Sequence, residues 1–380
     1  MALGILYFVL GIFLMILVHE AGHFFAARAF RIKVEEFFIG FGPRLWSIRR
    51  GETEYGLKAL PLGGYVRIAG MNPFQEPAPE DLPRTFGAKP KWQRAVVLVA
   101  GGATHFLLAF ILLVLMFGAI GVPRFRPVVQ GVEPRLEGVP SPAVDAGLRP
   151  GDEILAVDGR PVDTEAFPAY IDRHVGEPVT LLVERGGERI TVRATPVPSE
   201  VEGRQVGRLG IRVSGGEVMA RDRAGPVEAV ASAFGGTEQL PGVTDMVGGS
   251  FRAMASIFGP EGLGRITEVL LGERERSVQD PIGVVGAARV SGQAVAAGQI
   301  EVFFFMFAFF NVFVGILNLL PLPPLDGGHL AVLGLEAALR RPIDPRKLVP
   351  VSAVVATFLI LFTVAILYLD VTSPVPNLFR

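Results

Sequence analysis

Two histidines and a glutamate near the start of the chain have the spacing of a metal-binding motif. His19, Glu20 and His23 lie within five consecutive positions. In an α-helix, residues four apart lie on the same face, so both imidazoles can bind one divalent ion such as Zn²⁺. The intervening carboxylate can then accept a proton from water at the metal. The motif predicts hydrolytic metal chemistry if a third ligand exists.

The third ligand must come from elsewhere in the chain. The sequence has no Cys, so a metal must be held by His and carboxylates. Some zinc proteases carry a third His further along the same segment, but the matching positions here are Ala26 and Ala29. We expect Asp326 to be this ligand, because three prolines unwind the apolar segment just before it. His329 is a competing ligand, and a simple interfacial turn at Asp326 is the alternative without a metal.

Four apolar segments must position these residues. Each has about the 20 residues that a helix needs to cross a membrane, and they cover residues 2–29, 95–120, 302–322 and 348–369. An ionisable side chain at mid-membrane costs about 2.5 to 3.5 kcal/mol, which argues against a polar patch that only packs helices. The first segment lacks the positive amino-terminal region of a signal peptide, so we expect it to be retained.

The distribution of charge predicts the orientation in the membrane. From Arg28 to Arg94 there are twelve basic and seven acidic residues, which favours a cytoplasmic loop. From Gly121 to Glu301 there are nineteen Arg, no Lys and twenty-five acidic residues, which favours an extracytoplasmic segment. Both termini are then expected outside. The formal net charge of −1 gives no basic field for nucleic acid, so we expect no nucleic-acid partner.

The segments between the spans have patterns of their own. Residues 54–70 alternate partly and have Gly and Pro at their turns, which predicts a β-hairpin that dips toward the metal site. Residues 122–198 predict a small β-rich domain, 203–225 a connector rich in Gly and Arg, and 227–298 juxtamembrane helices. The expected fold class is a membrane protein with a four-helix α transmembrane bundle, a cytoplasmic-side re-entrant β-hairpin and an extracytoplasmic β-rich domain.

These patterns divide the chain into seven parts. They are a first transmembrane helix with the zinc motif (1–30), a cytoplasmic loop with the hairpin (31–94), a second transmembrane helix (95–120), the β-rich domain (121–200), an extracytoplasmic linker with juxtamembrane helices (201–301), a third transmembrane helix with the Asp ligand (302–327) and a fourth transmembrane helix (348–369).

Nearly the whole chain resembles the site-2 protease family of intramembrane zinc metalloproteases. The resemblance rests on the motif from His19 to His23, Gly40-Phe41-Gly42-Pro43, Pro61-Leu62-Gly63-Gly64-Tyr65 and the stretch from Asn318 to Gly327. It implies a Zn²⁺ site made by His19, His23 and Asp326, with Glu20 as the catalytic base. It also implies substrate contacts at Asn318 and, on a re-entrant β-loop, at Gly63 and Gly64.

The β-rich domain resembles a PDZ domain. The resemblance rests on the segments Ala146 to Asp152 and Val157 to Gly159, and the chain is most similar to actinobacterial members with a single PDZ domain. It implies a multi-pass protein of the bacterial plasma membrane with its active site toward the cytoplasm and its PDZ domain outside. The PDZ domain would bind a peptide or exclude bulky substrates.

The family implies regulated intramembrane proteolysis. The expected substrates are single-span membrane proteins, such as pre-trimmed anti-sigma factors, or remnant signal peptides within the bilayer. One alternative is a catalytically inactive membrane scaffold that bears a PDZ domain, although a purely structural metal would not need Glu20. Another is a zinc or proton transporter, which usually has broken helices in two repeats, whereas this sequence predicts a single broken helix.

One position departs from the family pattern. Many bacterial members have Gly-Pro and then an Asn at the start of the second span, where this chain has Gly101-Gly102-Ala103-Thr104-His105. His105 occupies the Asn position. A supporting role beside the metal, a contact with substrate and a simple interfacial His all remain open from the sequence.

Overall fold

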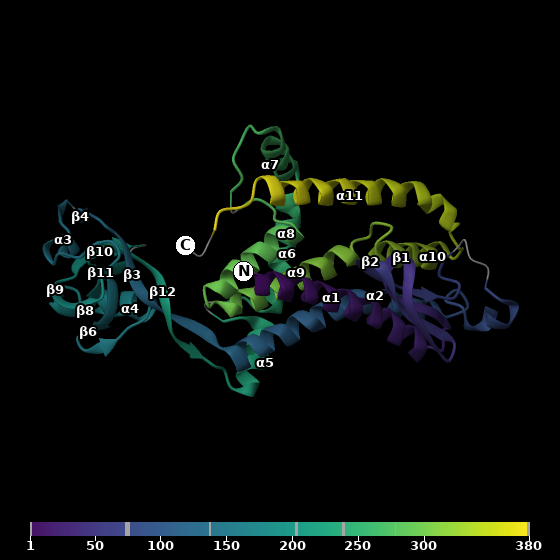
Figure 1. Cartoon of the computed structure of the whole chain (residues 1–380), viewed down its shortest axis with the longest axis horizontal. Helices are drawn as coiled ribbons and strands as arrows, with labels where there is room; N and C mark the ends of the chain where they lie inside the picture. Colours follow the sequence, from purple (N-terminus) through teal and green to yellow (C-terminus); the bar gives the residue numbers. More distant parts are fainter. Residues whose placement is uncertain are drawn as a thin grey trace. The chain divides into compact units, whose positions relative to one another are not determined.

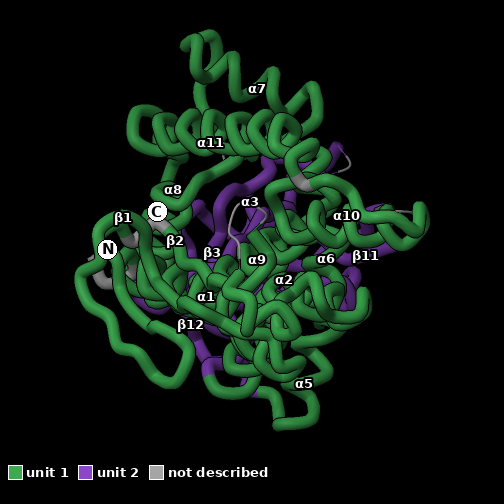
Figure 2. The backbone as a smooth tube through the Cα atoms, turned by 90° about the vertical axis from the view of Figure 1, so that its right-hand side faces the viewer, with its two compact units in different colours: residues 1–119, 224–380 green, residues 120–223 purple. Residues whose placement is uncertain are grey.

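The computed structural model describes residues 2–72, 77–136, 138–201, 204–237, 240–277 and 279–377. The chain forms two compact units, one of residues 1–119 with 224–380 and one of residues 120–223 (Figure 2). The first unit holds the apolar helices and the second is largely β-sheet. Each is described by itself.

Four helices among the described residues are long and apolar enough to cross a membrane. They cover Ile5–Ala29, Lys91–Ile120, Ile300–Leu319 and Arg346–Thr372. The corresponding elements are α1 (Ala2–Ala29), α2 (Lys91–Leu115) with a π-helical turn (Met116–Ile120), α9 (Ile300–Leu319), and α11 (Val349–Thr372) after a short 3₁₀ turn (Pro345–Leu348). These helices overlap the four predicted segments. The third ends at Leu319, before the prolines, because Pro cannot continue a helix.

Glycines let α1, α2 and α9 pack closely side by side (Figure 1). A Cβ on Gly22 of α1 would lie 2.6 Å from the carbonyl oxygen of Ala100 on α2. On the other side of α2, a Cβ on Gly315 of α9 would lie 2.9 Å from Cβ of His105. Small residues of this kind allow helix backbones to approach each other within a membrane. Helix α2 is therefore the centre of this three-helix group.

The loop after α1 forms a β-sheet that is larger than expected. Residues 54–70 were predicted to form a hairpin by themselves, and this is wrong. The hairpin consists of β1 (Val34–Arg50) and β2 (Thr53–Ile68), and its turn lies at Gly51 and Glu52. Residues 36–39 of β1 pair with both residues 54–57 and residues 64–67 of β2, so bends at the glycines fold two long strands into a sheet of several segments.

The sheet shares an apolar core with the helices. The buried side chains come from α1, the loop after it, the sheet, α2 and α10 (Asp326–Leu339), and they include Phe24, Ile32, Val34, Ile68, Leu98 and Leu333. At about 1.5 to 3 kcal/mol for each large apolar side chain removed from water, this core fixes the sheet against the end of α1. The sheet is thereby held next to the predicted metal motif.

Four further helices complete the first unit. They are α5 (Pro226–Gly235), α6 (Val243–Phe258), α7 (Pro260–Leu271) and α8 (Val284–Ala296), and a short 3₁₀ helix (Pro79–Arg84) precedes α2. Helix α8 contacts α1, α9 and α11. Asp370 near the end of α11 is fully buried, and it pairs with Arg276 at 2.9 Å and accepts a hydrogen bond from the amide of Gly286 at 2.7 Å. The ion pair joins α11 to the loop before α8, and the hydrogen bond joins α11 to the first turn of α8.

The second unit is a sheet with two short helices. The strands are β3 (Val122–Val132), β4 (Arg135–Leu136), β5 (Val139–Pro140), β6 (Glu153–Val157), β7 (Arg160–Pro161), β8 (Val179–Arg185), β9 (Glu188–Ala194), β10 (Val197–Val201), β11 (Arg204–Arg208) and β12 (Ile211–Asp222), and the helices are α3 (Pro142–Asp145) and α4 (Ala166–Arg173). The main sheet has the order β12-β3-β6-β8-β9, with β7 on β6. The predicted connector at 203–225 instead forms β11 and β12, because its alternating residues pair with neighbouring strands.

Candidate metal centre

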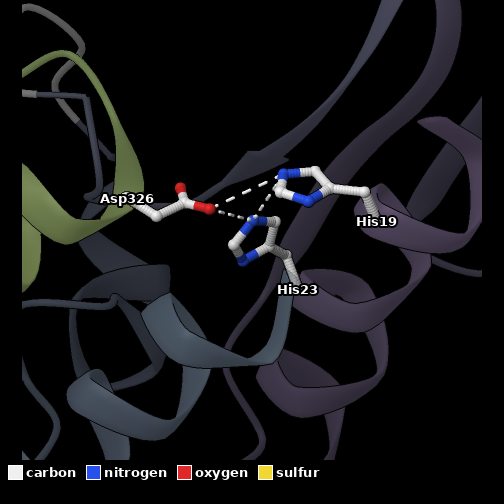
Figure 3. A group of neighbouring side chains, drawn as sticks. All are labelled: His19, His23 and Asp326. Atoms are coloured by element: carbon white, nitrogen blue, oxygen red, sulfur yellow. Dashed lines mark hydrogen bonds and ion pairs between the residues drawn. The ribbon is translucent and has the colours of Figure 1, made fainter. Parts of the chain in front are cut away.

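The side chains of His19, His23 and Asp326 converge on one point (Figure 3). Nε2 of His23 lies 3.3 Å from Oδ2 of Asp326, and Nε2 of His19 lies 3.6 Å from the same oxygen. The two Nε2 atoms are 3.3 Å apart. Among the described residues, this is the group whose three ligand atoms all lie within 4.8 Å of one another. Two residues four apart on α1 thus meet a carboxylate about 300 positions later in the chain.

The proline-rich turn brings Asp326 to the two histidines. The chain leaves the helix at Leu320 and starts α10 at Asp326. Gly327 and Gly328 allow this compact turn, because a Cβ on Gly327 would lie 2.2 Å from the carbonyl of Leu319 and one on Gly328 would lie 2.3 Å from the nitrogen of Pro323. The sequence Asp-Gly-Gly therefore combines a candidate ligand with two residues that leave the backbone room to turn.

Hydrogen bonding fixes the tautomer of His23. Its Nδ1 lies 2.8 Å from the carbonyl oxygen of Val97 on α2. A carbonyl can only accept, so Nδ1 carries a proton, and in the neutral ring Nε2 then has a lone pair on the side of Asp326. Histidines that bind metals usually donate their second ring N–H to such an acceptor. His23 therefore has the tautomer that a ligand needs.

The three residues fit a zinc ion. Within the described part of the chain, Oδ2 of Asp326 is buried and has no hydrogen-bond partner. Two imidazole nitrogens and one carboxylate oxygen face each other, and this set of donor atoms can hold a divalent cation. This donor set matches catalytic zinc sites, which have three protein ligands and an open position for water or substrate.

Glu20 of α1 lies against the β1–β2 sheet. A Cβ on Gly64 of β2 would lie 3.2 Å from Cγ of Glu20 and 3.1 Å from Cγ2 of Ile16. The main chain of Val66 is within hydrogen-bonding reach of the Glu20 carboxylate. The sheet segment that contains Gly64 therefore lies directly against the carboxylate between the two histidines.

Comparison with known proteins identifies the family. The sequence model of Peptidase family M50 matches residues 7–362 of this chain. The chain belongs to peptidase family M50, the site-2 protease family. Zinc metalloprotease Rip1 of Mycobacterium tuberculosis is 33% identical over 401 aligned residues, which cover 98% of both chains. Rip1 of Mycolicibacterium smegmatis is 34% identical over 99% of this chain and 98% of its own. Metalloprotease MmpA of Caulobacter vibrioides is 33% identical over 89% of this chain and 87% of its own.

The family establishes the activity and the cofactor. This M50 chain is a zinc metalloprotease, and its four apolar helices agree with a bacterial membrane protein. The resemblance to site-2 proteases is confirmed. A PDZ domain from Listeria monocytogenes is 23% identical over 24% of this chain and 90% of its own, with a TM-score of 0.21, which is too low to assign the fold of the second unit.

The other predicted residues of this protease lie on β2, α9 and α10. Gly63 lies against Phe41 of β1, whose Cε2 would be 2.6 Å from a Cβ on this glycine. Asn318 is half-buried in the last turn of α9, just before the chain unwinds. His329, the competing ligand, is outside the converging group and instead lines a cavity of about 460 Å³ with residues 65–68, 71 and 72.

Asn311, which the sequence did not single out, lies beside His105 near the site. His105 is buried, and its ring lies 5.0 Å from the ring of His19, centre to centre. Nδ1 of His105 lies 3.3 Å from Oδ1 of Asn311 on α9. Asn311 is a polar residue in the middle of an apolar helix, and only the close packing of α2 on α9 shows that it faces this site.

Proposed function

We propose that this M50 protease hydrolyses peptide bonds of single-span membrane proteins within the bilayer, such as pre-trimmed anti-sigma factors or remnant signal peptides. The observation that carries this proposal is the convergence of His19 and His23, on a helix long enough to span a membrane, with Asp326, which follows the end of another such helix. His19, His23 and Asp326 would hold the zinc ion. When bound, zinc polarises the scissile carbonyl and lowers the pKa of water at the site to about 7.

The role of Glu20 follows from its position. It is the residue after His19 on α1, and its carboxylate stands between the two histidines and β2. Glu20 accepts a proton from the attacking water and later donates it to the nitrogen of the leaving amine. A carboxylate is suited to both steps because it can hold the proton between them.

The sheet offers a place for an unwound substrate. A helical substrate hides its carbonyls in its own hydrogen bonds, so it must become extended before it is cut. Residues 64–67 pair with β1 on one side, and a substrate strand can pair with the other side. The cavity of about 460 Å³ lies along this segment. Gly63 and Gly64 would keep side chains out of the path of the substrate backbone, and Asn318 would contact the substrate from α9.

The distribution of charge supports a site near the cytoplasmic face. The sheet belongs to the loop with excess Lys and Arg, and the second unit belongs to the segment without Lys. The natural chain has no Cys, so single cysteines report sidedness. In intact cells, a membrane-impermeant maleimide should label Arg189→Cys on the second unit and should not label Glu52→Cys on the hairpin turn. The opposite labelling would contradict this orientation.

The second unit would regulate access as a PDZ domain. A cavity of about 340 Å³ lies between α4 and residues 206–213 and is lined by Phe167 and Ile171. A peptide could bind there, or the whole unit could exclude substrates that still carry a bulky outer domain. Removing residues 122–198 should then allow untrimmed substrates to be cut. Unchanged size discrimination would contradict this role.

Cleavage in proteoliposomes tests the proposed function. The purified chain is mixed with a labelled single-span peptide, and the products are mapped by mass spectrometry. We expect products cut within the apolar segment, loss of cutting with a zinc chelator and recovery with added zinc. An inactive scaffold would give no products. A transporter would move zinc or protons across the vesicle membrane without cutting, and either result would contradict the proposal.

A further inference from the structure

A buried pair of polar residues, His105 and Asn311, lies next to the candidate metal centre. His105 of α2 is 2% exposed and Asn311 of α9 is 0% exposed. The ring of His105 lies 5.0 Å from the ring of His19, with 37° between the ring planes. His105 does not belong to the converging group of ligand atoms. A buried polar pair is costly unless it is hydrogen-bonded, so its partners identify what it does.

The hydrogen bonds of Asn311 fix the protonation of His105. Nδ2 of Asn311 donates to the carbonyl oxygen of Phe307 at 2.8 Å. The amide oxygen Oδ1 must therefore be the atom that faces His105, at 3.3 Å from Nδ1. Because Oδ1 can only accept, Nδ1 of His105 carries the proton. Nε2 of His105 is then a lone pair.

The same reasoning applies to His19. Nε2 of His19 faces Asp326 and His23, so a role as a metal ligand requires a lone pair there and a proton on Nδ1. Over the described residues, Nδ1 of His19 and Nε2 of His105 are both buried and without a hydrogen-bond partner. A donor on His19 and an acceptor on His105, neither of them with a hydrogen-bond partner, thus lie on neighbouring rings.

A second acceptor near His19 is shared. The main chain of Gly101 is within hydrogen-bonding reach of this ring, and its carbonyl also accepts a hydrogen bond from Oγ1 of Thr104 at 2.7 Å. His23, in contrast, has a full partner for its Nδ1 in the carbonyl of Val97. Apart from this shared carbonyl, His19 has no hydrogen-bonded acceptor, among the residues that the structure describes, for the second hydrogen bond that metal-binding histidines usually make.

We propose that His105, oriented by Asn311, accepts a hydrogen bond from the Nδ1–H of His19, directly or through one buried water. The proposal rests on the proposed role of His19 as a zinc ligand. His105 and Asn311 are then positioning residues that hold the imidazole of His19 in the tautomer and orientation that the metal needs. The chain of groups runs from Asn311 on α9 through His105 on α2 to His19 on α1, so it joins all three helices at the metal.

The expected effect is on zinc affinity. Loss of such outer partners typically weakens metal affinity or activity 10- to 100-fold. His105→Leu and Asn311→Leu should each weaken zinc binding by about this factor, measured by competition with a chelator on the full-length protein in detergent. Because both residues act through the same hydrogen bond, the double variant should be no worse than the more affected single variant.

Two further variants separate positioning from packing. His105→Gln keeps an amide oxygen that can accept from His19, so it should recover part of the lost affinity, whereas a packing role would make Leu and Gln equal. Leu112→Ala opens a cavity at another buried position of α2 and is the packing control, and it should keep the zinc affinity. With Co²⁺ in place of zinc, His105→Leu should change the visible absorption bands and Leu112→Ala should not.

The outcomes distinguish this inference from the proposed function. If the natural chain binds zinc and His105→Leu binds it within twofold with the same cobalt spectrum, the positioning role is overturned and the zinc site stands. A cobalt spectrum that shows His105 as a direct fourth ligand also overturns it. If the natural chain binds no zinc, both proposals fall.

Discussion

Gly101 of α2 lies so close to His23 of α1 that a Cβ at this position would stand 2.2 Å from Nε2 of the imidazole. Real Cβ atoms do not approach other atoms this closely, so only glycine fits while His23 keeps its orientation. The same helix supplies the carbonyl of Val97 that accepts from Nδ1 of His23. Helix α2 therefore shapes the metal centre through its backbone.

Replacing this glycine should disturb the metal centre. In Gly101→Ala the methyl group must push the His23 ring away, so we expect zinc affinity and cleavage to fall by at least tenfold. The control is Gly334→Ala on α10, where a Cβ meets no atom within 4 Å and Ala favours the helix by about 1 kcal/mol. Zinc content by elemental analysis and peptide cleavage check both variants. Normal zinc binding by Gly101→Ala would contradict the position of His23.

Removing the carboxylate of Glu20 should separate binding from chemistry. Glu20→Gln keeps the size of the side chain but cannot accept the proton, so we expect stoichiometric zinc and no cleavage of a single-span substrate. Glu52→Gln is the same chemical change in the hairpin turn, where Glu52 is 41% exposed and pairs with Arg84. It should cleave normally. Robust cleavage by Glu20→Gln would refute its role as the base.

Asp326→Asn should weaken the binding of zinc. The amide is a poorer ligand than the carboxylate, so zinc binding should weaken strongly while the helices remain folded. Asp344→Asn is the control, because Asp344 caps the short 3₁₀ turn before α11 and lies outside the metal centre. Isothermal titration with zinc compares the two. Unchanged affinity in Asp326→Asn would move the third ligand elsewhere.

The second unit should lose stability in acid. Asp152 is fully buried, which favours a higher pKa, but hydrogen bonds from Arg185 at 2.6 and 2.7 Å and from the Arg149 amide at 2.8 Å hold the pKa of Asp152 below its ordinary value of 3.8. Because the folded pKa is the lower one, the stabilisation is present above this ordinary value and is lost as pH falls through the folded pKa.

Asp152→Asn makes this dependence measurable. At pH 7 the variant loses charged hydrogen bonds worth about 1.5 to 3 kcal/mol each, so amides of β6 and β8 should exchange hydrogen faster than in the natural chain. Well below pH 3.8 the natural carboxyl is itself protonated, and the difference in protection should shrink. A difference that stays constant even well below pH 3.8 would show that Asp152 does not titrate with folding.

The sequence predicted the parts of the molecule that follow from local chemistry. The four apolar stretches predicted the helices that are long enough to span a membrane. The spacing of His19 and His23 predicted that both side chains lie on one face of the first helix. The prolines before Asp326 indicated where the third helix ends. Such signals are local, because length, hydropathy and proline act on their own segment.

The parts that could not be predicted depend on contacts between distant residues. The hairpin was predicted too far along the sequence. Residues 36–39 pair with two segments of β2, and the pattern of a single strand does not reveal this. Residues 203–225 were taken for a connector because their Gly and Arg content hides the pairing of β12 with β3. The contact of His105 with Asn311 joins positions 206 apart, so it appears only when α2 packs on α9.

X-ray absorption at the zinc edge of the purified Glu20→Gln protein tests the central claim most directly. Two imidazole nitrogens should bind zinc at about 2.0 to 2.1 Å, together with carboxylate and water oxygens at about 2.0 to 2.2 Å, and the imidazole signal should fall by half in a protein that also carries His23→Ala. A protein without zinc, or a zinc shell with no imidazole, would contradict the metal centre of His19, His23 and Asp326.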